Sequence, residues 1–154
     1  MSLYVVDASV VVKWFVPEIH SEEARRLLDA AHEYMAPDLL FAETANAIWK
    51  KVRRKELSLE EGQRLVADMG KVAVETVSCR SLAEDAHALA TATGRTVYDC
   101  MYVALAARLN TRSITADDRL EAVLRSFPAV SRHVQLLQTF ELDAEEDQQS
   151  GETE

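Results

Sequence analysis

The chain has 154 residues, 48% of them hydrophobic, which is enough to bury the core of one domain. Its two cysteines, Cys79 and Cys100, form no CxxC pair and have no histidine at metal-ligand spacing, which argues against a disulfide framework and a zinc site. The formal net charge is -9, but seven acids and no lysine or arginine lie in residues 141–154, which leaves -2 for the rest. A nucleic-acid substrate is therefore not excluded by the charge.

The first part of the chain predicts one strand followed by helices. Residues 3–6 (LYVV) are a short apolar run rich in β-branched and aromatic residues, which is typical of a buried strand, and the run stops at Asp7. Residues 8–15 keep an apolar face up to Pro17. Helices are predicted over 21–34, where acids occupy the first turn, and over 38–54, where apolar residues form one wide face.

The second part predicts helices that alternate with short strands. Ser58 with Glu61, and Ser81 with Glu84, have the spacing of a helix-capping pair and predict helices over 58–69 and 81–94. The remaining elements are expected to be strands at 72–77, 112–115 and 133–137 and helices at 98–109 and 117–126. This alternation predicts an α/β fold with a parallel sheet of about five short strands and helices on both faces.

The two ends of the chain differ from the middle in composition. After Leu142 the sequence loses hydrophobic periodicity and becomes acidic, so we expect one domain over residues 1–140 and a disordered tail over 141–154. Near the N-terminus, Asp7 and Lys13 interrupt an apolar stretch that is neither a signal peptide nor long enough to span a bilayer. We therefore expect a soluble, cytoplasmic protein with no membrane partner.

Four acids stand where an isolated carboxylate would be unfavourable. Asp7 directly follows the first strand and Asp117 lies two residues beyond Thr115, so both should project into the crevice at the carboxyl edge of the sheet. Glu43 and Asp99 each lie in a helix of largely apolar residues. Carboxylates brought together repel one another, and a hard cation such as Mg²⁺ or Mn²⁺ offsets that repulsion. The pattern predicts a site for one or two metal ions, suited to phosphodiester hydrolysis.

Other interpretations of these residues stay open. Any one of the acids could instead be a helix cap or a solvated surface residue. Asp118 adjoins Asp117 and could contact metal instead, although the spacing from Thr115 favours Asp117. A basic cluster near the end of the 38–54 helix could hold RNA phosphates or could simply complement the helix dipole; its members are Lys50, Lys51, Arg53, Arg54 and Lys55.

The segments around the four acids resemble the motifs of PIN-domain nucleases. They are VVDAS at 5–9, PDLLFAETANA at 37–47, TVYDCMYVALA at 96–106 and TADDRL at 115–120, with matching order and spacing. The short single-domain form is most similar to the VapC-type toxins of toxin–antitoxin pairs. The resemblance implies a Rossmann-like sheet, with catalytic metal ligands at Asp7, Glu43, Asp99 and Asp117 and with supporting polar groups at Ser9, Asn46 and Thr115.

The resemblance also implies an activity and partners. It implies a Mg²⁺-dependent endoribonuclease whose products carry a 5′-phosphate and a 3′-hydroxyl, a homodimer, and an antitoxin whose chain blocks the pocket. The alternative is a non-catalytic PIN-like module that binds RNA or protein, and it is not favoured because all four acidic positions are filled. A receiver domain would need paired acids where Asp7 is single, and a nucleotide-binding enzyme would need a glycine-rich loop that is missing.

Overall fold

The computed structural model describes residues 2–141, and the core of this part is a five-stranded sheet. Its strands are β1 (Leu3–Val6), β2 (Glu33–Pro37), β3 (Glu75–Val77), β4 (Ser113–Thr115) and β5 (Val134–Leu136). The strand order is β3-β2-β1-β4-β5, and every neighbouring pair is parallel. The parallel α/β sheet predicted from the sequence is therefore confirmed, with the first strand of the chain at its centre.

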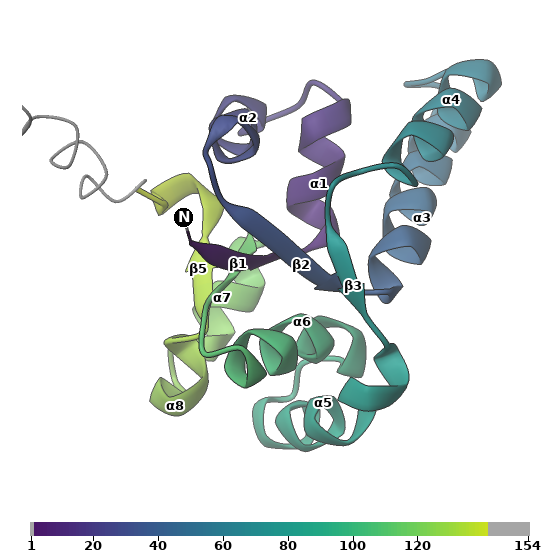
Figure 1. Ribbon diagram of the computed structural model, residues 1–154. Helices are drawn as coiled ribbons and strands as arrows, with labels where there is room; N and C mark the ends of the chain where they lie inside the picture. The colour runs from purple at the N-terminus through teal and green to yellow at the C-terminus, as the bar shows by residue number, and fades with distance from the viewer. Residues whose placement is uncertain (1, 142–154) are drawn as a thin grey trace, which may run out of the picture.

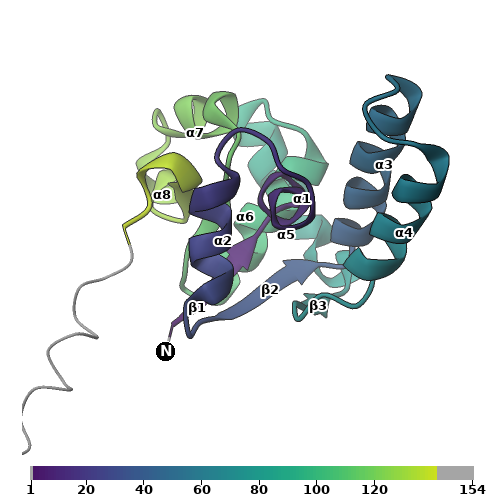
Figure 2. The same ribbon diagram turned by 90° about the horizontal axis from the view of Figure 1, so that it is seen from above.

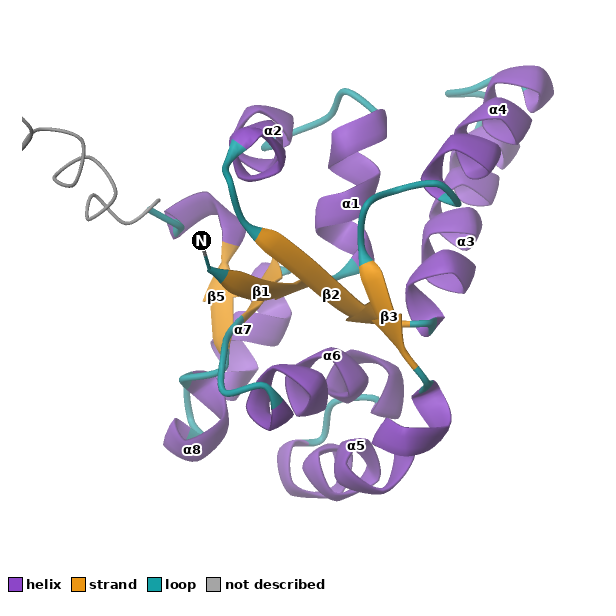
Figure 3. Cartoon of the chain, viewed as in Figure 1, coloured by secondary structure: helices purple, strands orange, loops and turns teal. Residues whose placement is uncertain are grey.

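Helices cover both faces of the sheet (Figures 1 and 3). They are α1 (Ala8–Phe15), α2 (Ser21–Asp29), α3 (Leu39–Arg53), α4 (Leu59–Met69), α5 (Cys79–Thr93), α6 (Val97–Arg108), α7 (Asp118–Leu124) and α8 (Pro128–Ser131), followed by a 3₁₀ turn at Leu137–Thr139. Helices α1 and α2 lie on one face and α5 and α6 on the other. Helices α3 and α4 pack side by side next to the sheet, as the view from above also shows (Figure 2).

Local side chains explain where several helices begin and end. The Ser58 hydroxyl accepts a hydrogen bond from the N–H of Glu61 at 3.1 Å, which caps α4 as predicted. Asp7 caps α1 and Thr96 caps α6 in the same manner. Helix α5 ends at Gly94, whose φ of 76° lies in the left-handed region that favours glycine. The chain reverses there, so that α6 returns antiparallel beside α5.

Several elements differ from the sequence prediction, among them the strand expected over 72–77, which is limited to Glu75–Val77. The helix predicted over 21–34 ends at Asp29, and residues 33–37 form β2 instead, because pairing with β1 and β3 on its two sides stabilises this segment as a strand. Helix α5 begins three residues earlier than predicted, because Ser78 rather than Ser81 is its cap. The Ser81 hydroxyl lies inside the helix and donates to the carbonyl of Ser78 at 2.8 Å.

The core fixes α6 against the sheet. Every residue from Cys100 to Ala106 is buried, and Leu105 packs with Val5, Val6 and Ile114 of the two central strands. A helix buried on nearly all sides cannot rotate without disturbing the core, so the side chains in its first turns have fixed positions. The acidic residue in that first turn is Asp99.

Two predictions about the ends of the chain have different outcomes. Within residues 2–141, no helix is both long enough and apolar enough to cross a membrane. Residues 142–154, which contain most of the predicted acidic tail, lie outside the described residues.

Candidate active site

Asp7 lies where β1 ends and α1 begins, beside the end of β4. Its carboxylate accepts hydrogen bonds from the Ser9 hydroxyl and from the backbone N–H of Val10. The Ser9 oxygen accepts in turn from the N–H of Ala116 at 2.9 Å. Ser9 therefore orients the Asp7 carboxylate and ties the carboxyl ends of the two central strands together.

Asp117 reaches the same edge of the sheet from the other central strand. Thr115 is buried at the end of β4, and its hydroxyl accepts from the N–H of Asp117 at 3.1 Å. The Asp117 carboxylate caps α7 by accepting from two backbone N–H groups at 3.0 and 3.1 Å. Asp118, the alternative candidate, is exposed, and it accepts from the side-chain amide of Gln138 at 3.0 Å. The adjacent acids therefore have different partners.

Glu43 and Tyr102 connect α3 to α6. The buried Tyr102 hydroxyl donates to the Glu43 carboxylate at 2.6 Å. Tyr102 lies three residues after Asp99, on the same side of α6. The tyrosine therefore holds Glu43 close to the face of α6 that carries Asp99.

Arg95 occupies the space between Asp99 and Asp117. One guanidinium nitrogen, Nη2, lies 2.8 Å from Asp99 Oδ2 and 3.8 Å from Asp117 Oδ2. The Arg95 Nε is buried and has no hydrogen-bond partner among residues 2–141. Two of the four acids singled out from the sequence are therefore paired with a cation supplied by the chain itself.

Charge interactions link each of the four acids to the next one around the site. Burial raises the pKa of Asp7 to about 6, with a further rise from the charge of Glu43, while hydrogen bonds from Ser9, Thr115 and the Val10 N–H oppose the shift. Burial also raises the pKa of Glu43, against the Tyr102 hydrogen bond and together with the charge of Asp99. Asp99 in turn shares Arg95 with Asp117.

The donor set fits a hard divalent ion, although the side chains do not converge on one point. Among residues 2–141, no three His, Cys, Asp or Glu side chains stand close enough together to hold a metal. The candidate metal ligands are all carboxylate oxygens, which Mg²⁺ and Mn²⁺ prefer. Asp7 and Glu43 have hydroxyl partners and raised pKa values, and a cation bound there would favour their charged form. Coordination by all four carboxylates would require Arg95 to leave Asp99 and Asp117.

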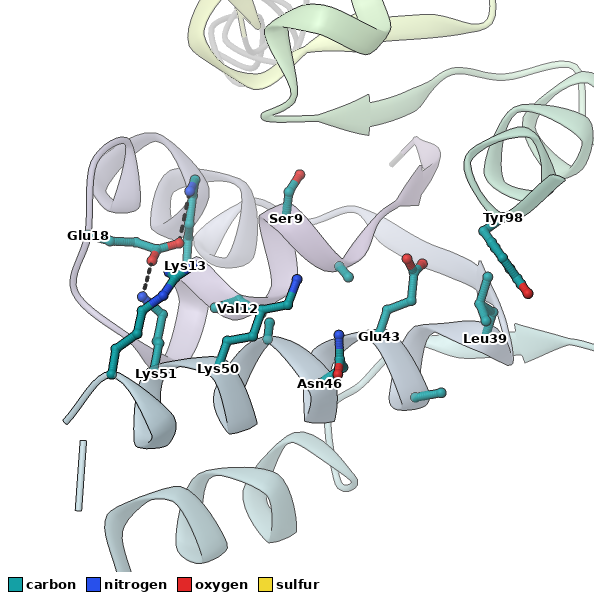
Figure 4. Close-up of a pocket in the computed structure, with 14 residues that line it drawn as sticks. Ser9, Val12, Lys13, Glu18, Leu39, Glu43, Asn46, Lys50, Lys51 and Tyr98 are labelled. Carbon is teal, nitrogen blue, oxygen red and sulfur yellow. Dashed lines mark hydrogen bonds and ion pairs between the residues drawn. The ribbon is translucent and has the colours of Figure 1, made fainter. Parts of the chain in front are cut away.

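A groove of about 570 Å³ leads from Glu43 and Ser9 along α1 and α3. Glu43, Asn46, Lys50 and Arg54 line it from successive turns of α3 and its C-terminal end, and Figure 4 shows the first three directed toward α1. The groove is acidic at the Glu43 end and basic at the Arg54 end. This distribution of charge suits a chain of phosphates that passes over a metal centre.

The basic side chains of α3 differ in their partners. Lys51 and the buried Lys13 both contact the Glu18 carboxylate, each at 2.9 Å, and clamp the α1–α2 loop against α3. Arg53 lies over the exposed Trp49 ring, with its guanidinium carbon 5.5 Å from the ring centroid, and does not line the groove. Lys50 and Arg54 are exposed and line the groove. The predicted RNA contacts are therefore not equivalent.

Comparison with known proteins identifies the family. A family model described as PIN domain matches residues 4–125. The chain belongs to the PIN-domain family. This PIN domain is 38% identical over 128 residues to Ribonuclease VapC3 of Pyrobaculum aerophilum, an alignment that covers 82% of this chain and 95% of the relative.

Solved structures share the fold of this PIN domain. PAE2754 from Pyrobaculum aerophilum superposes with a TM-score of 0.64 and 20% identity, over 90% of this chain and 85% of the other. A toxin–antitoxin complex from Klebsiella pneumoniae contains a chain with a TM-score of 0.59 and 14% identity, over 90% of this chain and 99% of that one. At such low identity these structures support the fold, which agrees with the sheet expected for the family.

Two residues of the PIN-domain site were not predicted from the sequence. Tyr102 had a signal, because a residue three positions after Asp99 on a helix faces the same side. Arg95 had a weaker one, because it lies four residues before Asp99 but outside the predicted helices. Neither spacing reveals the partner that comes from elsewhere in the chain, Glu43 for the tyrosine and Asp117 for the arginine.

Proposed function

We propose that this PIN domain is a metal-dependent endoribonuclease and the toxin of a toxin–antitoxin pair. The observation that carries the proposal is the group of four carboxylates, Asp7, Glu43, Asp99 and Asp117, at the carboxyl edge of a parallel sheet, next to a groove with a basic far end. The 38% identity to a protein named Ribonuclease VapC3, over nearly its whole length, supports RNA as the substrate.

The four carboxylates would hold the ion, Mg²⁺ or Mn²⁺. When bound, such an ion activates water and stabilises negative charge on a phosphodiester during in-line displacement. Ser9 and Thr115 contribute hydroxyl groups that keep Asp7 in place, and Tyr102 does the same for Glu43. In this arrangement the carboxylates position the ion, and none of them attacks phosphorus.

The groove along α3 would take the RNA backbone. Lys50 and Arg54 face the groove and would contact phosphates on one side of the cleavage site, and Asn46 would offer an amide between them and Glu43. Lys51 contributes less to RNA affinity in this scheme, because Glu18 and Glu56 already pair with it. Arg53 and Trp49 lie outside the groove and would contact only a longer RNA.

An antitoxin would inhibit by entering the same pocket. A group of carboxylates attracts a guanidinium, which is permanently charged and forks onto carboxylate oxygens. We expect the partner to place an arginine or lysine near Asp7 or Glu43, the two acids that have no basic partner among residues 2–141. The toxin–antitoxin complex from Klebsiella pneumoniae, whose chain shares this fold, supports a partnership of this kind.

The test compares two neutralised acids in purified protein. Asp99→Asn should lower the rate of RNA cleavage by roughly 100-fold or more, since even groups behind metal ligands often contribute 10- to 100-fold. Asp118→Asn, which removes the same charge from the exposed residue bonded to Gln138, should keep most of the activity. Cleavage should also stop in excess chelator and return with Mn²⁺, and the new RNA ends should carry 5′-phosphates.

The opposite results would remove the nuclease assignment. Undiminished cleavage by Asp99→Asn, or by the unaltered protein in excess chelator, would show that these carboxylates do not hold a catalytic ion. Binding of RNA without any cleavage in the presence of Mn²⁺ would favour a non-catalytic binding module.

A further inference from the structure

Arg95 is held at the site by the turn between α5 and α6. It directly follows Gly94, whose left-handed conformation reverses the chain, and it precedes the cap of α6, Thr96. From this turn the guanidinium extends between Asp99 and Asp117, 2.8 Å from the first and 3.8 Å from the second. The side chain is 25% exposed, so it lies inside the site and is not simply part of the outer surface.

The ion pairs of Arg95 divide the acids into two halves. Asp99 and Asp117 share the guanidinium, whereas Asp7 and Glu43 have no basic side-chain partner among residues 2–141 and accept hydrogen bonds from hydroxyls, including those of Ser9 and Tyr102. Two of the cations that line the groove, Lys50 and Arg54, form no ion pair with these acids in the described part of the chain. The charge of one half of the site is therefore partly offset by the chain, and that of the other half is not.

An arginine and a divalent ion compete for the same two carboxylates. Asp99 Oδ2 and Asp117 Oδ2 are the atoms that approach Nη2, and a carboxylate oxygen engaged by a guanidinium is less available to a cation. The position of Arg95 is also not fully satisfied, because its buried Nε lacks a partner among residues 2–141. A buried N–H without a partner is unfavourable, so departure of the side chain would recover part of the energy of the lost ion pairs.

We propose that Arg95 is a built-in counter-cation that offsets part of the negative charge of Asp99 and Asp117 in the metal-free protein and competes with the divalent ion for them. The inference rests on the proposed metal-dependent function. Arg95 is a positioning residue in this scheme, since it acts through the two carboxylates. It stabilises the free protein and weakens metal binding, so that the site fills only at a higher concentration of free metal ion.

The test measures metal binding and stability, both apart from cleavage. The whole chain is titrated with Mn²⁺ alone by calorimetry, and its melting temperature is recorded in excess chelator. Arg95→Gln should bind Mn²⁺ roughly fivefold or more tightly, as expected when a competing partly exposed ion pair is lost, and should melt at a lower temperature in chelator. The control is Arg119→Gln, which removes the same charge from an exposed position two residues after Asp117 and should change both quantities much less.

Each outcome separates this inference from the function on which it rests. Equal Mn²⁺ affinity of the unaltered protein and Arg95→Gln, or the same gain in Arg119→Gln, would overturn the competition. No Mn²⁺ binding by any of the proteins would overturn the metal-dependent function, and this inference with it. If Arg95→Gln unfolds in chelator, Mn²⁺ binding by Arg95→Lys is measured instead, because lysine keeps the charge but lacks the forked guanidinium that reaches two carboxylates. Tighter binding than in the unaltered protein supports the proposal, and equal binding overturns it.

Discussion

Asp7 is a carboxylate that the fold makes difficult to ionise. Burial raises its pKa from 3.8 to about 6, although Ser9, Thr115 and the Val10 N–H all donate to it. Because the pKa is higher in the folded protein than in the unfolded chain, the proton stabilises the folded state at low pH. That contribution is lost as the pH rises from about 4 through 6. In the absence of metal, the ionised Asp7 therefore opposes folding at neutral pH.

Asp7→Asn should accordingly stabilise the metal-free protein. At pH 7 in excess chelator, we expect the free energy of unfolding to rise by about 1 to 3 kcal/mol, since one pKa unit corresponds to about 1.4 kcal/mol. Near pH 4 the gain should largely disappear, because Asp7 is then protonated in the folded protein. Urea denaturation at the two pH values measures this difference. A variant that is less stable at pH 7, or a gain that is independent of pH, would contradict the assignment.

At the residue scale, the sequence predicted where the acidic residues lie better than it predicted which side chains they contact. Asp7 and Asp117 follow strands, and the rule that parallel strands share a carboxyl edge is enough to bring them together. The ion pair between Arg95 and Asp117 depends on how the α5–α6 turn is placed against β4, which no local pattern specifies. A contact between distant segments becomes predictable only once the packing of the elements is known.

At the scale of elements, the pair formed by α3 and α4 depends on a close approach at one glycine. A Cβ added to Gly62 of α4 would lie 2.5 Å from Cγ2 of Val52 in α3, closer than two carbon atoms can pack. A Cβ added to Gly70, at the end of α4, would find its nearest neighbour at 3.4 Å. A steric need for glycine therefore exists at Gly62 and not at Gly70.

Alanine substitution should distinguish the two positions. Gly62→Ala should lower the free energy of unfolding by about 1 to 3 kcal/mol through overpacking, despite the better helix propensity of alanine. Gly70→Ala should be neutral or raise it by up to about 1 kcal/mol, since the φ of -64° at Gly70 suits any residue. In Gly62→Ala with Val52→Ala, the loss should be smaller than the sum of the single losses. Additive losses in denaturation experiments would mean that the clash does not limit the pair.

The elements that the sequence predicted well carry their own local signals. Strand β1 is a continuous apolar run that ends at a charge, and α4 begins at a serine with an acid three residues later. Strand β2 (EYMAP) carries no such signal, because its residues also suit the end of a helix and Pro37 resembles a turn. Neighbours on both sides make it a strand, and those neighbours come from residues 3–6 and 75–77.

At the scale of the whole molecule, charge is the property that bears most on RNA binding. The net charge is -9, and residues 142–154 contribute six acids and no basic residue: Asp143, Glu145, Glu146, Asp147, Glu152 and Glu154. These charges repel a polyanion over a distance set by the ionic strength. They oppose the attraction that the basic end of the groove provides.

Neutralising the six acids should therefore strengthen RNA binding. In the chain carrying Asp99→Asn, which we expect to slow cleavage strongly, replacement of all six by asparagine or glutamine should raise RNA affinity by roughly tenfold at low salt. The difference should shrink as salt is added, because screening removes the repulsion. Filter binding over a series of salt concentrations measures it. An unchanged affinity at low salt would show that the acidic segment stays electrostatically remote from the RNA.

The central place of β1 in the sheet has a consequence for synthesis of the protein. The ribosome makes β1 first, but β4, the strand that flanks it on one side, only much later. Asp7 exists from the start, while the Ala116 N–H that fixes Ser9, and Asp117 itself, are added after most of the chain has left the peptidyl transferase centre. Translation products that stop before β4 therefore lack a neighbour for β1 and one of the four acids. A cell that makes this PIN domain therefore completes the set of four acids only after β4 and Asp117 have been synthesised.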